Sequence, residues 1–478
     1  MAVIKESRGD KIFNIVNGAL ITLFVLVVLY PLYFVVIASF SNPNLVAAGE
    51  VWFYPKSPTL DAYKTVFQNN SIVTGYLNTI FYTVLEHQGT LDFILEQFLP
   101  KGLAKLDAPV REILRAALAQ ARYMQVPVSA AVNEAVKLTR TFKKSSASGL
   151  VNAVLRKACS YDLSTASFKN EVERLMVLGS AGRDVAEFLH KNYPDEALDI
   201  LTYKADGGMT SLRANPLKGS ADELCAKLLA SGAKEAKRGI VPGSVLARFE
   251  GSPAENELFR QGYFHVEGQA SQLAALCVDP QPGETVIDLC AAPGGKTLLL
   301  AEEMQNTGTL YSCDAAENRV QLIRTAVERM GFTNVKTLCN DATQTNPALP
   351  QADRILADVP CSGLGILAKK PDLRYKKLEP AREAELLATQ SATLDTGAQL
   401  LKAGGRLVYS TCTIDPAENQ QQIAAFLQRH PEFAVCAPDV PLPAGMTAGK
   451  HGCLSVPTRT GMDGFFLCAM QKNGEKLQ

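Results

Sequence analysis

The sequence predicts an α/β fold: a Rossmann-like core with a parallel sheet, preceded by an all-helical segment and an N-terminal transmembrane helix. The core is indicated by a short apolar run, Val286–Leu289, that ends in a glycine-rich turn, and by later apolar runs that each end in an aspartate. The transmembrane helix is indicated by an uncharged apolar stretch from Gly18 to Phe40. The chain has 478 residues, enough for two or three domains, and its 48 basic and 48 acidic residues cancel.

The glycine-rich turn lies in the segment Glu284–Thr297, with the sequence ETVIDLCAAPGGKT. Its small residues leave backbone exposed, and a helix that begins near Lys296 would aim its free N–H groups at a ligand. The end of the segment imitates a phosphate-binding P-loop, but that motif needs glycine at the position of Cys290, and the chain has no G-x-G-x-x-G motif. We therefore expect this turn to bind a ligand that is not held through a phosphate group.

Three later apolar runs end in acidic residues, Asp314, Asp341 and Asp358. The carboxyl ends of parallel strands meet at the edge of the sheet where ligands of open α/β folds bind, and the acid after the second strand, Asp314, can accept hydrogen bonds from ribose hydroxyls. A helix cap or a turn would explain any one of these acids. The three together, behind a glycine-rich turn, favour a nucleoside-type cofactor.

Three motifs occur in order along the chain: CAAPGGKT at 290–297, DVPCSG at 358–363 and YSTC at 409–412. They resemble those of the RNA cytosine-5 methyltransferases of the RsmB (Sun) and NOP family, and the resemblance extends from about Leu91 to the C-terminus. It implies a class I methyltransferase core at residues 240–472 that uses S-adenosylmethionine. It also implies that Asp314 holds the ribose, that Asp341 accepts from the adenine amino group, and that Asp358 lies near both cofactor and base. The implied cofactor loop consists of Cys290, Ala291, Ala292, Pro293, Gly294, Gly295 and Lys296.

Two of the eleven cysteines follow predicted strands, Cys361 in a Pro-Cys-Ser-Gly turn and Cys412 in a Thr-Cys-Thr turn. Carbon 5 of cytosine is a poor nucleophile, so an enzyme first adds a thiolate to carbon 6, and the carbon 5 proton must later leave so that the thiolate is expelled. A nucleophile and a second group for proton removal are both useful for this chemistry. The remaining cysteines are expected to be buried and inert, and their irregular spacing argues against a zinc ribbon or a disulfide scaffold.

The resemblance assigns roles to these groups. Cys412 is the implied nucleophile, and Cys361 assists proton removal and product release. DNA cytosine-5 methyltransferases take their nucleophile from the Pro-Cys turn instead, so the Thr-Cys-Thr turn favours the RNA class. Asp358 could stabilise the adduct at ring nitrogen 3 or the amino group, and Lys296 could favour the thiolate or the cofactor carboxylate.

Residues 86–160 carry apolar side chains at helical spacing, with eleven basic and three acidic residues between Lys101 and Lys157. This excess suits an RNA backbone, although solvated helix faces would also explain it. The segments PVSAAVNEAVKLTR and GLVNAVLRK resemble later helices of a NusB-like RNA-binding domain, which would here be truncated. Residues 161–239 are interpreted as a linker and a family-specific segment before the core, in which Arg213 either faces RNA or lies on the surface of a strand.

A basic segment in the second half, Lys369–Lys377, includes Tyr375. Charge and stacking on the tyrosine ring could guide single-stranded RNA along this segment. A solvated loop is the alternative.

Residues 1–85 differ from the rest of the chain. The apolar stretch at residues 18–40 is long enough to cross a bilayer, and Lys5, Arg8 and Lys11 precede it, so the positive-inside rule places the N-terminus in the cytoplasm and the following chain outside. An enzyme that needs RNA cannot work there. Residues 1–83 resemble the start of a carbohydrate ABC-transporter permease, and we interpret the chain as a fusion or an assembly artefact joined between Tyr82 and Glu86.

The sequence therefore predicts methyl transfer from S-adenosylmethionine to carbon 5 of a cytidine in 16S rRNA through a covalent cysteine adduct. A tRNA target is one alternative, and an inactive fusion related to membrane transport is another. We expect a monomer that needs no metal. The catalytic portion is expected in the cytoplasm, tethered to the membrane if the N-terminal segment is genuine.

Overall fold

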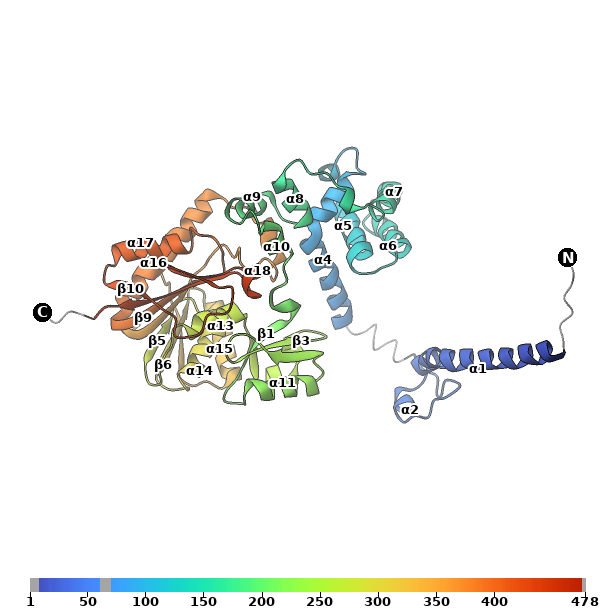
Figure 1. Cartoon of the computed structure of the whole chain (residues 1–478), viewed down its shortest axis with the longest axis horizontal. Helices are drawn as coiled ribbons and strands as arrows, with labels where there is room; N and C mark the ends of the chain where they lie inside the picture. The colour runs from blue at the N-terminus through green and yellow to red at the C-terminus, as the bar shows by residue number, and fades with distance from the viewer. Residues whose placement is uncertain (1–7, 61–69, 475–478) are drawn as a thin grey trace. The chain divides into compact units, whose positions relative to one another are not determined.

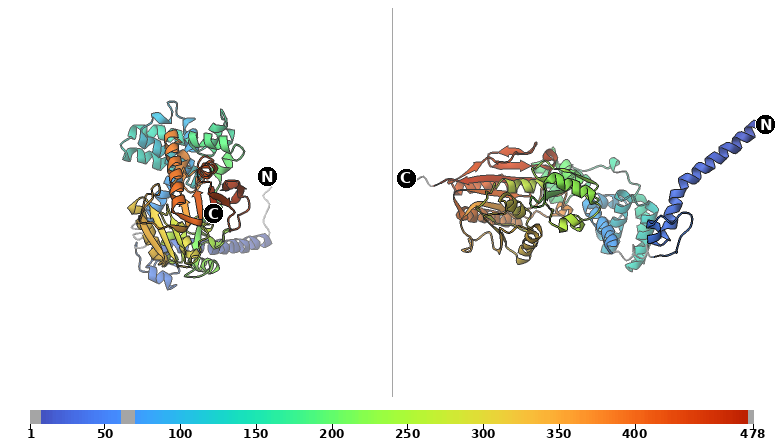
Figure 2. Two further views of the ribbon diagram at one scale, coloured as in Figure 1. Left: turned by 90° about the vertical axis from the view of Figure 1, so that its left-hand side faces the viewer. Right: turned by 90° about the horizontal axis from the view of Figure 1, so that it is seen from below.

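The computed structural model describes residues 8–60 and 70–474, and the chain divides into two compact units, Met1–Thr83 and Val84–Gln478 (Figures 1 and 2). The division lies within residues 82–86, the interval in which the sequence predicts a junction. Helix α4 (Asn70–Glu96) carries the chain from one unit into the other.

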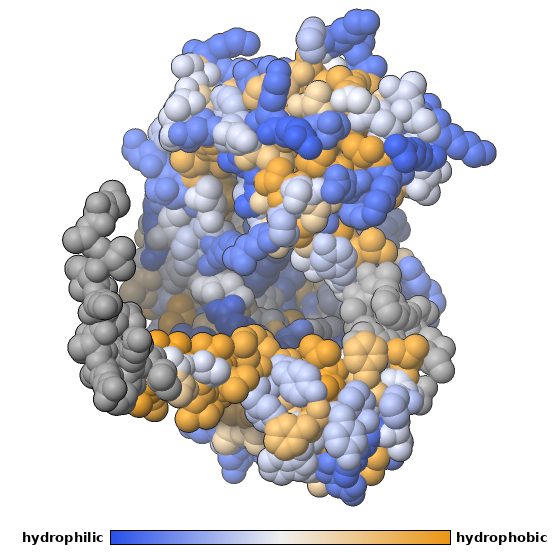
Figure 3. Space-filling view, turned by 90° about the vertical axis from the view of Figure 1, so that its right-hand side faces the viewer, coloured by the Kyte–Doolittle hydropathy of each residue, from blue (hydrophilic) through white to orange (hydrophobic). Residues whose placement is uncertain are grey.

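The first unit is dominated by the long helix α1 (Arg8–Ser39), which is followed by the short helix α2 (Pro43–Ala47). Within α1, Val16–Ser39 is long and apolar enough to cross a membrane by length and composition. Its large side chains, among them Leu23 and Phe24, are exposed, and orange apolar side chains cover much of this unit in the lower part of Figure 3. The expected apolar helix is present.

The second unit begins with helices that bury the apolar residues found at helical spacing. The end of α4 packs with α5 (Ala108–Tyr123), α6 (Val128–Thr141) and α7 (Ser148–Ala158) around a core that includes Leu91, Leu118 and Leu155. A second helical cluster follows, made of α8 (Glu171–Leu178), α9 (Arg183–Asn192) and α10 (Ala197–Thr202). Its core includes Leu364 and Ile414, so this cluster packs directly against the turns that carry the predicted cysteines.

A small antiparallel sheet of four strands precedes the main sheet. Its order is β2 (Glu235–Arg238), β3 (Ser244–Arg248), β1 (Thr210–Ala214) and β4 (Phe264–Val266), with helices α11 (Ala221–Ala230) and α12 (Glu257–Arg260) between the strands in sequence. The expected start of the core at residue 240 falls between β2 and β3 of this sheet. The predicted boundary between residues 239 and 240 thus divides this sheet, and the domain limits stay a prediction.

The main sheet has nine strands, in the order β11-β12-β13-β9-β8-β5-β6-β7, with β10 also paired to β13. The neighbours β7, β6, β5, β8 and β9 run parallel, and β13 runs antiparallel to β9. Each predicted parallel strand is present, which confirms the Rossmann-like fold. The strand bounds are β5 (Thr285–Asp288), β6 (Thr309–Asp314), β7 (Val335–Cys339), β8 (Ala352–Asp358), β9 (Leu401–Thr411), β10 (Phe433–Cys436), β11 (Thr447–Gly449), β12 (Gly452–Ser455) and β13 (Phe465–Lys472).

Helices cover both faces of this sheet. Val286 faces a core formed with α13 (Gln269–Leu276), α14 (Gly295–Glu303) and α15 (Glu317–Met330), whereas Ile287 faces a core formed with α16 (Pro380–Leu400) and α17 (Gln420–Arg429). Adjacent residues of a strand point to opposite faces, so a parallel strand with two covered faces is a continuous apolar run. The last helix, α18 (Pro457–Thr460), lies between β12 and β13 in the chain.

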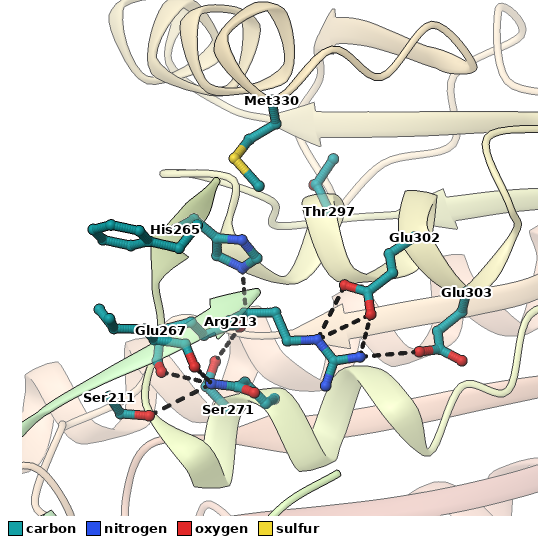
Figure 4. Close-up of polar contacts among 12 residues, drawn as sticks. Ser211, Arg213, His265, Glu267, Ser271, Thr297, Glu302, Glu303 and Met330 are labelled. Atoms are coloured by element: carbon teal, nitrogen blue, oxygen red, sulfur yellow. Dashed lines mark hydrogen bonds and ion pairs between the residues drawn. The ribbon is translucent and has the colours of Figure 1, made fainter. Parts of the chain in front are cut away.

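Arg213 lies on β1 but does not face RNA or solvent, so both predictions for it are wrong. The side chain is buried, and its Nε donates to Glu302 Oε2 at 3.0 Å. A second ion pair joins it to Glu303 at 3.2 Å (Figure 4). Both acids lie at the end of α14, so Arg213 fastens the small sheet to the helix that follows the glycine-rich turn.

Replacing Arg213 should destabilise the protein, because the poorly exposed Glu302 carboxylate would lose its cation. We expect Arg213→Ala to cost about 3–5 kcal/mol, the usual loss when one member of a buried ion pair is removed. The measurement is the urea midpoint of the full chain. Arg238→Ala is the control, because Arg238 and Asp222 form an exposed pair that contributes at most about 1 kcal/mol. Equal midpoints for the two variants would contradict this expectation.

Candidate active site

The glycine-rich turn between β5 and α14 leaves a helix end open. Gly294 has a φ of 111°, a conformation that side-chain-bearing residues rarely adopt, and α14 starts at the next residue without a side-chain cap. The first backbone N–H groups of the helix therefore have no partner within the helix. A Cβ atom added to Gly295 would lie 3.2 Å from Cδ of Glu267, so glycine permits a close approach between this turn and that carboxylate.

The two predicted cysteines meet at the carboxyl edge of the sheet. Cys361 follows β8, Cys412 follows β9, and their Sγ atoms are 3.2 Å apart. The turns are also joined by a 2.8 Å hydrogen bond between the hydroxyls of Ser362 and Thr413. The buried Glu418 carboxylate accepts from the Ser362 N–H at 2.9 Å and so fixes the Cys361 turn.

The surroundings of the two thiols shift their pKa values in opposite directions. The hydrogen bond from Cys361 lowers the pKa of Cys412, and the positive charges of Lys296 and Lys370 also lower it, whereas burial and the charge of Asp358 act in the opposite direction. The same hydrogen bond, followed by burial, raises the pKa of Cys361 well above its usual value. Cys412 is therefore the more acidic thiol of the pair.

An ion pair connects the cysteine turns to the glycine-rich turn. Lys296 Nζ lies 2.7 Å from Asp358 Oδ2, and the Ser410 hydroxyl donates to Asp358 Oδ1 at 2.7 Å. Burial would lower the pKa of Lys296, but the negative charges of Asp358 and Glu267 outweigh it and raise this pKa. Lys296 is thus a fixed cation between the turn and the cysteine pair.

A cavity of about 230 Å³ lies against the glycine-rich turn. Of the residues predicted to bind a cofactor, seven line it: Cys290, Ala291, Ala292, Pro293, Gly295, Lys296 and Asp358. Gly294 caps the adjoining helix and does not line the cavity.

Asp314 and Asp341 lie outside the lining of this cavity. Asp314 accepts from the Ala292 N–H at 3.3 Å and pairs with Arg319 at 3.3 Å, so it braces the glycine-rich turn from the next strand. Asp341 is exposed and accepts from the N–H and hydroxyl of Thr343 at 2.9 and 2.7 Å. Their roles toward ribose and adenine stay predictions.

Two acids that the sequence reasoning missed also line the cavity, Asp288 and Glu267. Asp288 ends β5, and burial together with the charge of Asp358 raises its pKa to about 7, despite a hydrogen bond from Thr297. Its Oδ1 atom is buried and has no hydrogen-bond partner among the described residues. Asp288 could have been found, because it ends the first strand just as Asp314 and Asp358 end later ones. Nothing in the local sequence distinguishes Glu267.

The basic segment Lys369–Lys377 does not form the expected stacking surface. Tyr375 shares a 2.9 Å hydrogen bond with Ser180, and its hydroxyl accepts from the Gly89 N–H at 3.1 Å. Arg374 is buried and donates to the Gly179 carbonyl at 3.3 Å. Lys369 forms ion pairs with two buried acids, Asp463 at 2.6 Å and Asp206 at 3.2 Å. The segment holds the helical part of the second unit to the catalytic part, so the solvated-loop alternative is also wrong for these three side chains.

Comparisons with known proteins agree with this geometry. The model of the 16S rRNA methyltransferase RsmB/F family matches residues 275–471, and the model of the NusB family matches residues 54–160. The chain is 34% identical over 433 residues to the probable ribosomal RNA small subunit methyltransferase B of Bacillus subtilis, with 86% of this chain and 94% of that protein covered. It is 35% identical over 408 residues to the protein of the same name from Synechocystis, with 83% and 91% covered. The crystal structure of PH0851 matches with a TM-score of 0.71 and 30% identity, covering 86% of this chain and 93% of that one.

The hydrogen bond between the cysteines can be tested without any substrate. In Cys361→Ala, Cys412 loses the donor that lowers its pKa, so we expect alkylation of Cys412 by iodoacetamide to begin at a higher pH than in the unmodified protein. Mass spectrometry of the labelled peptide across pH 6–10 measures this onset. Cys339→Ala, at an exposed cysteine on β7, is the control and should leave the onset unchanged. An unchanged onset in Cys361→Ala would mean that the pair is not coupled.

Proposed function

This chain belongs to the 16S rRNA methyltransferase RsmB/F family, and from that premise we propose that it methylates carbon 5 of a cytidine in 16S rRNA with S-adenosylmethionine as methyl donor. The observation that carries the proposal is the pair of thiols 3.2 Å apart at the edge of the sheet. A methyltransferase acting on oxygen or on an amino nitrogen has no need of a thiolate nucleophile beside a second thiol. Covalent activation of a pyrimidine ring uses a thiolate nucleophile, and a second group is useful for removing the carbon 5 proton.

The proposed reaction begins at Cys412, whose lowered pKa favours the thiolate. The thiolate adds to carbon 6 of the cytosine, and Asp358 stabilises the adduct through ring nitrogen 3 or the amino group. The donor supplies an electrophilic methyl group, which carbon 5 takes up. Once Cys412 is bound to carbon 6, Cys361 loses its hydrogen-bond partner and gives up its own proton to solvent. Its thiolate then takes the proton from carbon 5, so that the bond between carbon 6 and Cys412 breaks, Cys412 leaves as a thiolate and the methylated base is released.

The cavity at the glycine-rich turn fits the amino-acid end of the proposed donor. The N–H groups at the start of α14 and the cation of Lys296 favour a carboxylate at this point. The buried Oδ1 of Asp288 lacks a partner among the described residues and is ready to accept from a ligand. Asp314 and Asp341 are proposed to contact the ribose and the adenine beyond this cavity, in a donor that extends along the strand ends.

The helical part at the start of the second unit is proposed to bind the rRNA. Several of its basic residues form ion pairs within the domain, such as Arg115 with Asp92 at 2.6 Å. Seven others form no ion pair with any described residue: Lys101, Lys105, Arg122, Arg140, Lys143, Arg156 and Lys157. Cations that are not engaged by acidic side chains are available to bind phosphate groups, which supports a contact with the RNA backbone.

The catalytic unit is proposed to work in the cytoplasm, where rRNA and the methyl donor occur, with α1 as a membrane tether. The exposed apolar surface of α1 supports the tether. Catalysis then needs the second unit on the cytoplasmic side. A single span with its basic N-terminus inside would place that unit on the other side, so the tether requires the opposite orientation.

Replacing Cys412 and replacing Cys361 should impair the reaction at different steps. Cys412→Ala should reduce transfer of tritiated methyl groups to 16S rRNA by at least about 1,000-fold, because the nucleophile is lost. Cys361→Ala should instead accumulate a covalent complex with RNA, seen as a slow band on a denaturing gel. Cys339→Ala, far from the pair in sequence, should behave like the unmodified protein. Absence of the slow band would reverse or remove the roles assigned to the two cysteines.

Bisulfite sequencing of rRNA and tRNA from a deletion strain identifies the target. A cytidine of 16S rRNA that loses its modification supports the proposal, whereas a loss confined to tRNA shifts the target to that RNA. Absence of methyl transfer to either RNA by the purified protein would favour an inert fusion.

The tether predicts where the full chain is found after cell lysis. We expect it to sediment with membranes and to resist extraction with carbonate. Val27→Arg, at an exposed position in the middle of α1, should release most of it, because arginine costs about 2.5–3.5 kcal/mol at the centre of a span. Val128→Arg, at an exposed position on α6, is the control and should leave the distribution unchanged. A soluble unmodified chain would exclude the tether.

A further inference from the structure

Glu267 is a buried acid on the wall of the cavity at the glycine-rich turn, and the proposed reaction gives it no role. It follows β4 directly and faces Gly295, the first residue of α14. Figure 4 displays it between His265 and Ser271, beside the buried Arg213 that anchors α14. Its backbone N–H donates to the Ser211 carbonyl at 3.1 Å, so the position of its side chain is fixed by the small sheet.

The Glu267 carboxylate is held by two side chains and still has capacity to accept. His265 Nε2 lies 3.1 Å from Oε2, and the Ser271 hydroxyl donates to Oε1 at 2.8 Å. A carboxylate can accept about four hydrogen bonds, so each oxygen can accept one more. Burial alone would raise the pKa of Glu267, but the hydrogen bond and charge of His265 and the charge of Lys296 outweigh it and keep this pKa below its usual value.

The cavity has more negative than positive charge. Three carboxyl groups line it, those of Glu267, Asp288 and Asp358, against one cation, Lys296. That cation lies 2.7 Å from Asp358, and Glu267 is paired with His265 at 3.1 Å, yet the Glu267 oxygens and Oδ1 of Asp288 can still accept further hydrogen bonds. The unpartnered, fully buried Oδ1 of Asp288 independently indicates that a hydrogen-bond donor belongs here. A ligand with an ammonium group would satisfy both.

An amino-acid zwitterion fits the arrangement of charges at this end of the cavity. Its carboxylate and ammonium groups are attached to the same carbon atom, and Lys296 and Glu267 lie close enough that each shifts the pKa of the other. The carboxylate would lie toward Lys296 and the start of α14, and the ammonium group toward Glu267. A purely structural pairing of Glu267 with His265 would not need Glu267 on the cavity wall.

We propose that Glu267 is the residue that recognises the α-ammonium group of the methyl donor, so that the site discriminates against ligands that lack this group. The inference rests on the proposed function, because it assumes that the donor occupies this cavity. It adds a specificity residue that belongs to neither the glycine-rich turn nor the cysteine turns. It also gives the small sheet a part in cofactor binding, since β4 carries the residue into the cavity.

The test compares two ligands by isothermal titration calorimetry with the full chain. One is S-adenosylhomocysteine, and the other is its analogue in which a keto group replaces the α-amino group. A hydrogen bond to a charged group contributes about 10- to 100-fold in affinity, so the unmodified protein should prefer the amine by at least about tenfold. In Glu267→Gln this preference should fall to about twofold or less. Glu267→Asp keeps the charge and should retain most of the preference.

Glu303→Gln is the matched control, because Glu303 pairs with Arg213 in the same region and does not line the cavity. It should keep the full preference for the amine. Because the readout is a ratio of two affinities in one variant, a general loss of stability does not imitate the expected result. An unmodified protein that binds neither ligand would overturn the proposed function and this inference with it. Binding of both ligands with equal affinity, or an unchanged preference in Glu267→Gln, would overturn the inference alone.

Discussion

The partly buried ion pair between Lys296 and Asp358 is the interaction on which the arrangement of this site depends. Lys296 comes from the turn after β5, Asp358 ends β8, and Ser410 on β9 donates to the same carboxylate. A buried ammonium group needs an opposite charge, so these three strand ends cannot separate without leaving a charge unpaired. Asp358 is aligned with Ser410 in the parallel register of β8 and β9. The two cysteines follow this aligned pair by three and two residues, and they therefore emerge side by side.

The close approach of the thiols accounts for their unequal chemistry. Two acidic groups in contact cannot both ionise easily, so the proton stays on one of them and its hydrogen bond stabilises the other as an anion. The surroundings decide which thiol ionises. Lys296 and Lys370 lower the pKa of Cys412 while Asp358 raises it, whereas Glu418 raises the pKa of Cys361. The thiol that the resemblance proposes as the nucleophile, Cys412, is thus also the one whose pKa is lowered.

The sequence predicts the parallel strands and the meeting of the cysteines, because both depend on local signals. An apolar run bounded by a glycine-rich turn identifies a strand, and the ends of parallel strands share one edge. The sequence does not predict the burial of Arg213 or Tyr375, because that burial depends on distant parts of the chain. Arg213 contacts Glu302, 89 residues away, and Tyr375 contacts Ser180, 195 residues away. Charged or aromatic side chains without a nearby partner in sequence look like surface residues. Glu267 was missed for the same reason, because its cavity is assembled from distant segments.

Gathering charged groups at this edge of the sheet costs folding free energy. That cost is an argument for function that does not depend on family membership. Glu267, Asp288, Asp358 and Lys296 all lie within one small cavity wall, where burying charged groups opposes folding. The unpartnered Oδ1 of Asp288 adds a cost of about 1–3 kcal/mol. The apolar cores on both faces of the sheet can offset such a cost, but they do not explain why the acids gather at one point. Departures from ideal packing are expected at functional sites, because a bound ligand supplies the missing partners. The strand ends beside the glycine-rich turn are where those partners are missing.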